Sequence, residues 1–231
     1  MLLFFLSFVL ADVADDLKQA SNKNLPQNLR EDAFSRLVQQ GGKDSSLLKS
    51  IANDQKEELQ RRWISIRVLG RIGGRMMIDE IIPLLKDPKP DIRIAACSAL
   101  GDIRSWVATK SLRESLQDDV LTVRVAAAQA LGKLADPSAI EDLAQALYSE
   151  SHFYRGKGLW VRIHFVEAMG KLRDKRAYPT LLKALDDEDP KVQRSTVWAL
   201  EQTSGLSLGE GRSSEEEKEA WKRWLALQLT K

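Results

Sequence analysis

Few side chains in this sequence are suited to chemistry, and they do not form a recognisable catalytic pattern. The chain of 231 residues has one cysteine, Cys97, and two histidines, His152 and His164. A cysteine and a histidine can together make a nucleophile, because the histidine takes the thiol proton. However, no CxxC, HExxH, GxSxG or glycine-rich phosphate loop supports such chemistry. We therefore expect no catalytic residue, metal site or cofactor, with Cys97 a small buried side chain and His164 partly buried.

A stripe of arginines offers another kind of chemistry, which is phosphate binding. Arg67, Arg71 and Arg75 are spaced by four residues, so they would share one face of a helix. Such a face could bind a nucleic acid if it continued across further helices. Asp102 and Glu167 interrupt it further along the chain. The net charge of +2 also gives no general reason to expect a nucleic-acid partner.

The arginines belong to an internal repeat that organises the chain. Nine-residue segments related to RVAAAQALG recur at intervals of 31, 31, 38 and 31 residues, which is typical of a stacked array. Counted from the first residue of each segment as zero, positions +6, +7 and +10 are mostly apolar and share one helix face. A glycine at +8 in four segments indicates a close helix crossing. The segments begin at Arg62, Arg93, Arg124, Arg162 and Gln193.

A second one-sided helix follows each of the first four segments. Positions +19 and +23 are isoleucine or leucine in all four units. Pro88 and Pro190 fall in the turns between units, where a missing N–H does little harm. Because one helix pair cannot cover its own apolar face, the units must stack. The sequence predicts an all-α array of helix pairs that repeat at about 31 residues.

This repeat resembles the short HEAT-like repeats of phycobilisome-lyase-like bacterial proteins. Residues 123–147 (VRVAAAQALGKLADPSAIEDLAQAL) follow that pattern nearly throughout, and the resemblance covers about residues 25–205. It implies a right-handed αα-superhelix, with the first helix of each unit on the concave side. It also implies a structural ladder between the repeated arginine and acidic residues of the turns. The ladder would consist of Arg62, Asp87, Arg93, Asp118, Arg124, Arg162 and Asp187.

The resemblance implies no single function, since such arrays are scaffolds with many uses. Di-iron hydroxylases built on similar repeats need repeated His-Glu pairs, and none occurs in this sequence. A role as a bilin lyase or isomerase subunit follows only from the family name and is a remote alternative. The leading interpretation is a non-enzymatic scaffold that binds a protein or peptide on its concave face. Nucleic-acid binding through the arginine stripe is the second interpretation.

The binding interpretation depends on positions +1, +5 and +9, which we expect to face away from the stack. Position +1 is apolar in four units, whereas +5 and +9 are mostly polar. An exposed apolar row with a polar surround suits a partner segment with apolar anchors and an acidic end. The alternative is that adjacent helices half cover the row. The predicted partner-binding residues are Trp63, Arg67, Arg71, Ile94, Val125, Ile163 and Trp198.

The interval of 38 residues marks an insertion of seven residues between Leu147 and Val161. Loops inserted into repeat arrays often carry binding. We expect a secondary partner contact there, unless the loop folds back and its aromatic side chains cover a gap in the stack. The residues of this contact would be His152, Phe153, Tyr154, Arg155 and Lys157.

The two ends of the chain differ from the repeats. Residues 1–11 (MLLFFLSFVLA) are too short to span a bilayer and are similar to the core of a secretory signal that lacks a basic start. A signal would predict a periplasmic or secreted protein. The alternatives are a first helix packed on the array, in a cytoplasmic protein, and a membrane-surface anchor.

We expect a polar linker or frayed helix at 12–24, the array at 25–204, and a loop with a capping helix at 205–231, capped by Ser213 or Ser214.

Overall fold

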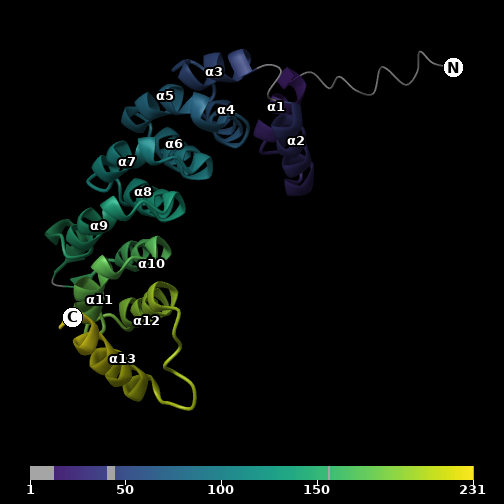
Figure 1. Ribbon diagram of the computed structural model, residues 1–231. Helices are drawn as coiled ribbons and strands as arrows, with labels where there is room; N and C mark the ends of the chain where they lie inside the picture. Colours follow the sequence, from purple (N-terminus) through teal and green to yellow (C-terminus); the bar gives the residue numbers. More distant parts are fainter. Residues whose placement is uncertain (1–12, 41–44, 156, 231) are drawn as a thin grey trace. The chain divides into compact units, whose positions relative to one another are not determined.

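The computed structural model describes residues 13–40, 45–155 and 157–230 of the chain (Figure 1). The apolar segment 1–11, for which the sequence left several interpretations open, lies outside the described residues. The α-helices are α1 (Val13–Ser21), α2 (Gln27–Gln40), α3 (Ser45–Asn53), α4 (Leu59–Ile72), α5 (Ile78–Ile81), α6 (Pro90–Ile103), α7 (Thr109–Ser115), α8 (Leu121–Leu134), α9 (Ile140–Leu147), α10 (Arg162–Leu172), α11 (Tyr178–Ala184), α12 (Pro190–Ser204) and α13 (Ser214–Leu229). Two short strands, β1 (Phe153–Tyr154) and β2 (Lys157–Gly158), form an antiparallel hairpin.

The predicted all-α array of helix pairs is confirmed. The five repeated segments lie on α4, α6, α8, α10 and α12, and shorter second helices follow the first four of them. Most of these second helices begin with a 3-10 turn, such as Pro137–Ala139 before α9. The chain divides into two compact units, Met1–Ile103 and Arg104–Lys231. Because a helix pair in an array packs only on its neighbours, such a chain can divide at a turn.

In the first unit, α4 and α6 pack closely because a glycine faces an alanine. A Cβ atom placed on Gly70 of α4 would lie 2.6 Å from the Cα of Ala99 on α6. Ile66, Leu69 and Leu100 on these two helices are at most 1% exposed. The glycine at +8 of one repeat therefore meets the alanine at +6 of the next, which is the close crossing that the glycine indicated.

The second unit repeats this contact between α10 and α12. A Cβ on Gly170 would lie 2.7 Å from the Cα of Ala199. The equivalent glycine of α8, Gly132, has more room, since its Cβ would lie 3.1 Å from Cδ of Lys171 and 3.3 Å from the Cα of Ala168. The same sequence pattern thus produces contacts of different tightness.

The segment 12–24, predicted to be a polar linker or a frayed helix, contains the helix α1. Its Leu17 is fully buried, and the helix packs on α2 and contacts α4. The carboxylate of Asp16 is also buried and accepts a hydrogen bond of 2.8 Å from Nε of Arg36 on α2. Residues 13–21 therefore belong to the packed core of the first unit.

The last helix, α13, is capped by Ser213, one of the two serines that the sequence offered for this position. The Ser213 hydroxyl accepts a bond from the backbone N–H of Glu216, and the Glu216 carboxylate accepts one from the backbone N–H of Ser213. Trp221 and Leu225 are fully buried, and α13 contacts α11 and α12. The ring of Trp224 packs edge-on against Trp221, with centroids 5.6 Å apart. These contacts cover the end of the second unit.

We expect Gly70→Ala to destabilise the protein more than Gly132→Ala. In a helix, alanine is favoured over glycine by roughly 1 kcal/mol at either position. At Gly70 the added methyl group would meet the backbone of α6, and overpacking of this kind costs about 1–3 kcal/mol. At Gly132 the nearest atom is on a flexible lysine side chain. Denaturant unfolding of both variants measures the difference, and equal losses of stability would contradict the close contact of α4 with α6.

Candidate partner-binding site

An open groove of about 870 Å³ lies between α2 and α4 in the first unit. Its apolar surface comes chiefly from Phe34 and Val38 of α2 and from Trp63 and Ile64 of α4. Phe34 and Val38 are four residues apart and therefore share one face of α2. The groove is thus made by two helix faces that approach each other.

Three of the predicted partner-binding residues, Trp63, Arg67 and Arg71, are brought together in this groove. They occur at intervals of four residues on α4, which places them on one face of the helix. The opposite wall comes from α2, which the sequence analysis did not include in the site. The spacing of Gln27, Glu31 and Phe34 was the signal that could have found it, since these residues also share a helix face.

The two arginines of α4 are held by one carboxylate. Arg67 and Arg71 both donate to Oδ2 of Asp102 on α6, over 3.1 Å and 3.0 Å. The Arg67 guanidinium also lies 5.7 Å from the ring centroid of Trp63, within reach of a cation–π interaction. Burial lowers the pKa of Arg67; the charge of Asp102 opposes this shift and that of Arg71 adds to it. Asp102, expected only to interrupt the arginine stripe, therefore neutralises part of it.

A third arginine, Arg30 of α2, lies in the same groove. Its Nε is buried and has no hydrogen-bond partner among the described residues. The neighbouring Glu31 accepts a hydrogen bond of 2.6 Å from Nε2 of Gln27 on its own helix. The α2 wall therefore contains a cationic donor that the fold leaves unsatisfied.

The remaining residues of the predicted apolar row are partly covered. Ile94 on α6 and Ile163 on α10 are half-buried, and Val125 on α8 is only 9% exposed. Trp198 on α12 is half-buried and lies so close to Gly170 that a Cβ on that glycine would be 2.9 Å from its ring. Val125 contradicts the expectation of an exposed row at position +1, whereas Ile94 and Ile163 are half covered, which is the alternative that the sequence left open.

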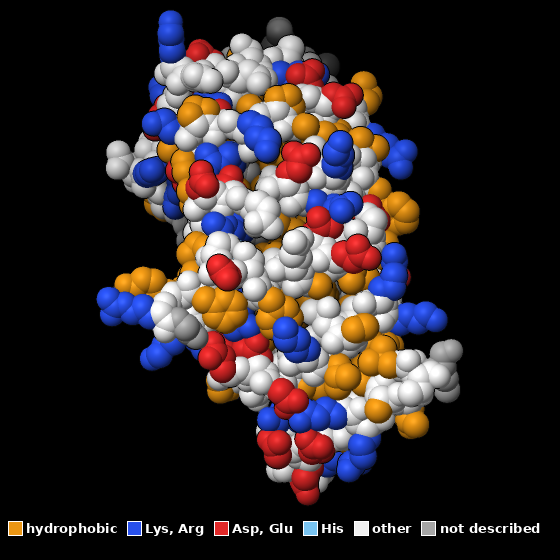
Figure 2. Space-filling view, turned by 90° about the vertical axis from the view of Figure 1, so that its left-hand side faces the viewer, with side chains coloured by type: hydrophobic (Ala, Val, Ile, Leu, Met, Phe, Trp, Pro, Cys, Tyr) orange, Lys and Arg blue, Asp and Glu red, His pale blue; other side chains and the backbone are white. Residues whose placement is uncertain are grey.

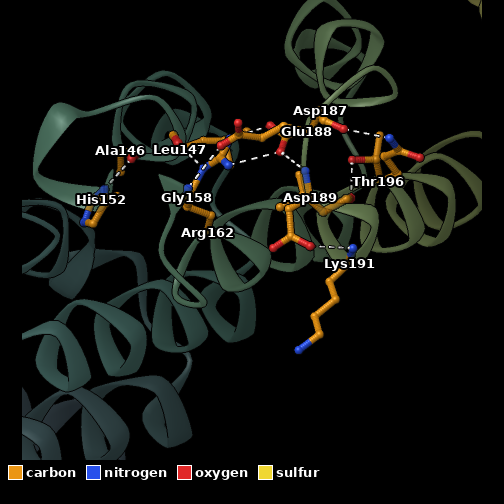
Figure 3. A network of polar contacts seen from close by, with 12 residues as sticks. Ala146, Leu147, His152, Gly158, Arg162, Asp187, Glu188, Asp189, Lys191 and Thr196 are labelled. Carbon is orange, nitrogen blue, oxygen red and sulfur yellow. Dashed lines mark hydrogen bonds and ion pairs between the residues drawn. The ribbon is translucent and has the colours of Figure 1, made fainter. Parts of the chain in front are cut away.

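A buried arginine network fixes the insertion in the second unit (Figure 3). Arg162 donates from Nε to the carbonyl of Leu147 over 3.1 Å and makes two bonds to Asp187, of which the one to Oδ1 measures 3.0 Å. Its guanidinium lies 4.5 Å from the ring centroid of Phe153. The first unit has an equivalent, in which Arg62 donates to Asp87 over 2.5 Å.

The other members of the predicted ladder use backbone carbonyls. Arg93 donates to the carbonyl of Asp87 over 2.9 Å, and Arg124 donates to the carbonyl of Asp118. Gln193 donates to the carbonyl of Asp187 over 2.6 Å, so it makes the same kind of bond at the position where the arginine is replaced. The ladder thus contains buried ion pairs and side-chain bonds to turn carbonyls.

The inserted loop forms the hairpin β1–β2, and its first residues are structural. His152 is fully buried, its Nδ1 lies 2.6 Å from the carbonyl of Ala146, and its Nε2 lies 2.8 Å from Arg124. Because a guanidinium can only donate, Nε2 accepts and Nδ1 carries the proton, so the ring is neutral. The prediction of a partner contact at His152 is corrected, and Phe153 lies half-buried beneath Arg162.

The tip of the hairpin is exposed. Tyr154 is 63% exposed, and Arg155 and Lys157 are also exposed. The Arg155 guanidinium lies 5.3 Å from the Tyr154 ring centroid. A secondary partner contact at these three residues remains a hypothesis.

The cysteine and histidine candidates lie on helices of different units. Cys97 is fully buried on α6, whereas His164 lies on α10, 3.0 Å from the carboxylate of Glu167 and edge-on to Trp160. Among the described residues, no group of three or more histidine, cysteine, aspartate or glutamate side chains could hold a metal ion. None of the described helices is long and apolar enough to cross a membrane.

Basic and acidic side chains lie next to one another in both units. In the view of Figure 2 they are interspersed over the described residues. Ion pairs such as Lys49–Glu80 and Arg113–Asp142 join neighbouring charges.

The sequence matches the family model of HEAT repeats over residues 45–124 and 159–214, which is more than half of the chain. The PBS lyase HEAT-like repeat also matches, at residues 123–149. The chain therefore belongs to the family of HEAT-repeat proteins. No significant match is found among curated protein sequences.

Solved structures with a similar fold have low sequence identity to this chain. The CpcE–CpcF complex of phycocyanin lyase from Nostoc sp. PCC7120 is 18% identical, with 94% of this chain and 95% of that chain covered and a TM-score of 0.50. An engineered protein is 19% identical over 83% of this chain and 53% of its own, with a TM-score of 0.52. A chain in a structure of Kap95p with RanGDP is 14% identical over 84% of this chain and 29% of its own, with a TM-score of 0.56. At these identities the likeness shows the fold alone.

We expect Asp187→Ala to destabilise the protein far more than Asp186→Ala. The first change leaves the buried Arg162 without its carboxylate, and breaking a buried ion pair costs about 3–5 kcal/mol. The second removes an exposed partner of Lys222, and exposed pairs contribute about 0–1 kcal/mol. Urea unfolding of both variants measures the difference. A small loss for Asp187→Ala would contradict the structural role of the network.

The pH dependence of stability tests the buried state of His152. Burial lowers its pKa below the ordinary value of 6.5; the bond to the Ala146 carbonyl opposes this shift, and the charges of Arg124 and Arg162 reinforce it. Because the pKa of His152 is lower in the folded than in the unfolded protein, its contribution to stability is complete above about pH 6.5. That contribution is lost as pH falls through the folded-state pKa. Thermal unfolding between pH 7 and 5 should show this loss, and His152→Gln should reduce it.

The control is Tyr154→Phe at the exposed hairpin tip, which leaves both histidines in place and should keep the wild-type dependence. If His152→Gln retained the full wild-type loss of stability, a buried neutral His152 would be ruled out as its source.

Proposed function

We propose that this protein is a non-enzymatic scaffold that binds a segment of another protein on the face made by the first helices of its repeats. The principal site in this proposal is the α2–α4 groove, with the exposed hairpin tip as a secondary contact. The observation that carries the proposal is that Trp63, Arg67 and Arg71 meet an apolar face of α2 around an open space of about 870 Å³.

The composition of the groove favours a protein segment as its occupant. Protein interfaces are rich in aromatic residues and arginine, and their strongest contacts are aromatic or apolar anchors in pockets with a polar rim. Phe34 and Trp63 provide aromatic surface from opposite walls, and the arginines supply the polar rim. A space of this size has room for several side chains of a partner.

The contacts of the arginines also favour a protein over a nucleic acid. A phosphate backbone would need several unneutralised cations in a row. Arg67 and Arg71 share the carboxylate of Asp102, and Arg75 is not among the residues of the groove. Kap95p, which shares the HEAT-type fold, is described as binding RanGDP, and a similar use of the array is what we propose for this chain.

We expect Trp63→Ala to weaken the capture of native partners, because it removes the largest apolar surface of the α4 wall. Loss of a central aromatic anchor lowers affinity by about tenfold or more. The control is Trp160→Ala, which removes a 50% exposed tryptophan outside the groove. Quantitative pull-down from an extract of the native host, with helix content checked by circular dichroism, compares the two variants. If folded Trp63→Ala retained every partner at wild-type levels, the groove would not be the site.

A further inference from the structure

The charges around the α2–α4 groove are not balanced within it. Three arginines and one glutamate line the space, and Glu31 is engaged by Gln27. Asp102 contributes one further carboxylate from α6, but it holds Arg67 and Arg71 at the same oxygen. The side chain of Arg71 is 52% exposed, so part of its guanidinium remains open to solvent and to an occupant. The groove therefore has an excess of positive charge beside its apolar surface.

Arg30 is the member of this set that the fold satisfies least. Its Nε is buried without a hydrogen-bond partner among the described residues, while the side chain as a whole is half-buried. A buried donor left unpaired is unfavourable, and a charged one more so. A carboxylate brought into the groove would satisfy it with a charge-assisted hydrogen bond. Arg67, in contrast, is already committed to Asp102 and to the Trp63 ring.

The apolar surface lies directly beside these cations. Trp63 is four residues before Arg67, and Phe34 is four residues after Arg30, so each helix places an aromatic residue and an arginine on the same face. A ligand that contacts both walls would meet apolar and basic groups at neighbouring points.

We infer that the groove selects a peptide segment in which a bulky apolar residue stands next to a carboxylate, and that Arg30 and Arg71 bind the carboxylate. This inference rests on the proposed function and adds the chemistry of the partner to it. A phosphate-bearing ligand fits less well, because it would leave the aromatic surface of Phe34 and Trp63 uncovered and its larger negative charge would be repelled more strongly by Glu31 and Asp102.

The test is a selection from a displayed library of random peptides on the wild-type protein. Enriched peptides should contain aspartate or glutamate adjacent to leucine, phenylalanine or tryptophan. A synthetic peptide from this set should bind at least about tenfold more tightly than its version with glutamine in place of the acidic residue, since a charge-assisted bond is lost. The doubly substituted Arg30→Gln/Arg71→Gln protein should bind both peptides with similar, weaker affinity.

The matched control is Arg75→Gln, which removes an exposed arginine outside the groove and should leave peptide affinity unchanged. Enriched peptides without an acidic preference, whose binding is lost in Trp63→Ala, would overturn the inferred chemistry while the groove remained a binding site. Failure to enrich any peptide, or peptide binding unaffected by Trp63→Ala, would overturn both the inference and the proposed site. Displacement of bound peptide by a single-stranded oligonucleotide, with affinity dependent on Arg75, would favour a nucleic acid instead.

Discussion

The structure depends on the close contact between first helices of successive repeats, in which a glycine of one helix faces an alanine of the next. Gly70 meets Ala99 in the first unit, and Gly170 meets Ala199 in the second. The same approach brings Asp102 of α6 to the arginines of α4. A packing contact in the core therefore determines how the groove presents its charged side chains.

The turns between helices are held by a second interaction, the bonds of the repeated arginine. Where the partner is a carboxylate, as for Arg162 and Asp187, the pair is buried and the arginine Nε also donates to a carbonyl oxygen, which helps to satisfy the buried charge. The inserted hairpin is attached to the same arginines, since Phe153 lies against Arg162 and His152 bonds to Arg124. The insertion is thus fixed at its base and exposed at its tip.

The sequence predicted the features that repeat and missed those that depend on a single contact. Periodicity predicted the helix pairs and the close crossings at the glycines, and local sequence placed the last cap at Ser213 or Ser214, because each follows from local spacing. It did not give the burial of Val125 or His152, which depends on how closely a neighbouring element packs. The α2 wall of the groove was missed because α2 departs from the repeat consensus. In the candidate site, the α4 residues could be predicted and Arg30 could not.

The central claim is that binding takes place between α2 and α4, and hydrogen exchange of the complete protein with and without a captured partner tests it most directly. The account predicts that the partner slows amide exchange at residues 27–40 and 59–72, with at most a smaller effect at the hairpin. A partner that slows exchange at the hairpin and at α10–α12, and leaves α2 and α4 unchanged, would contradict it.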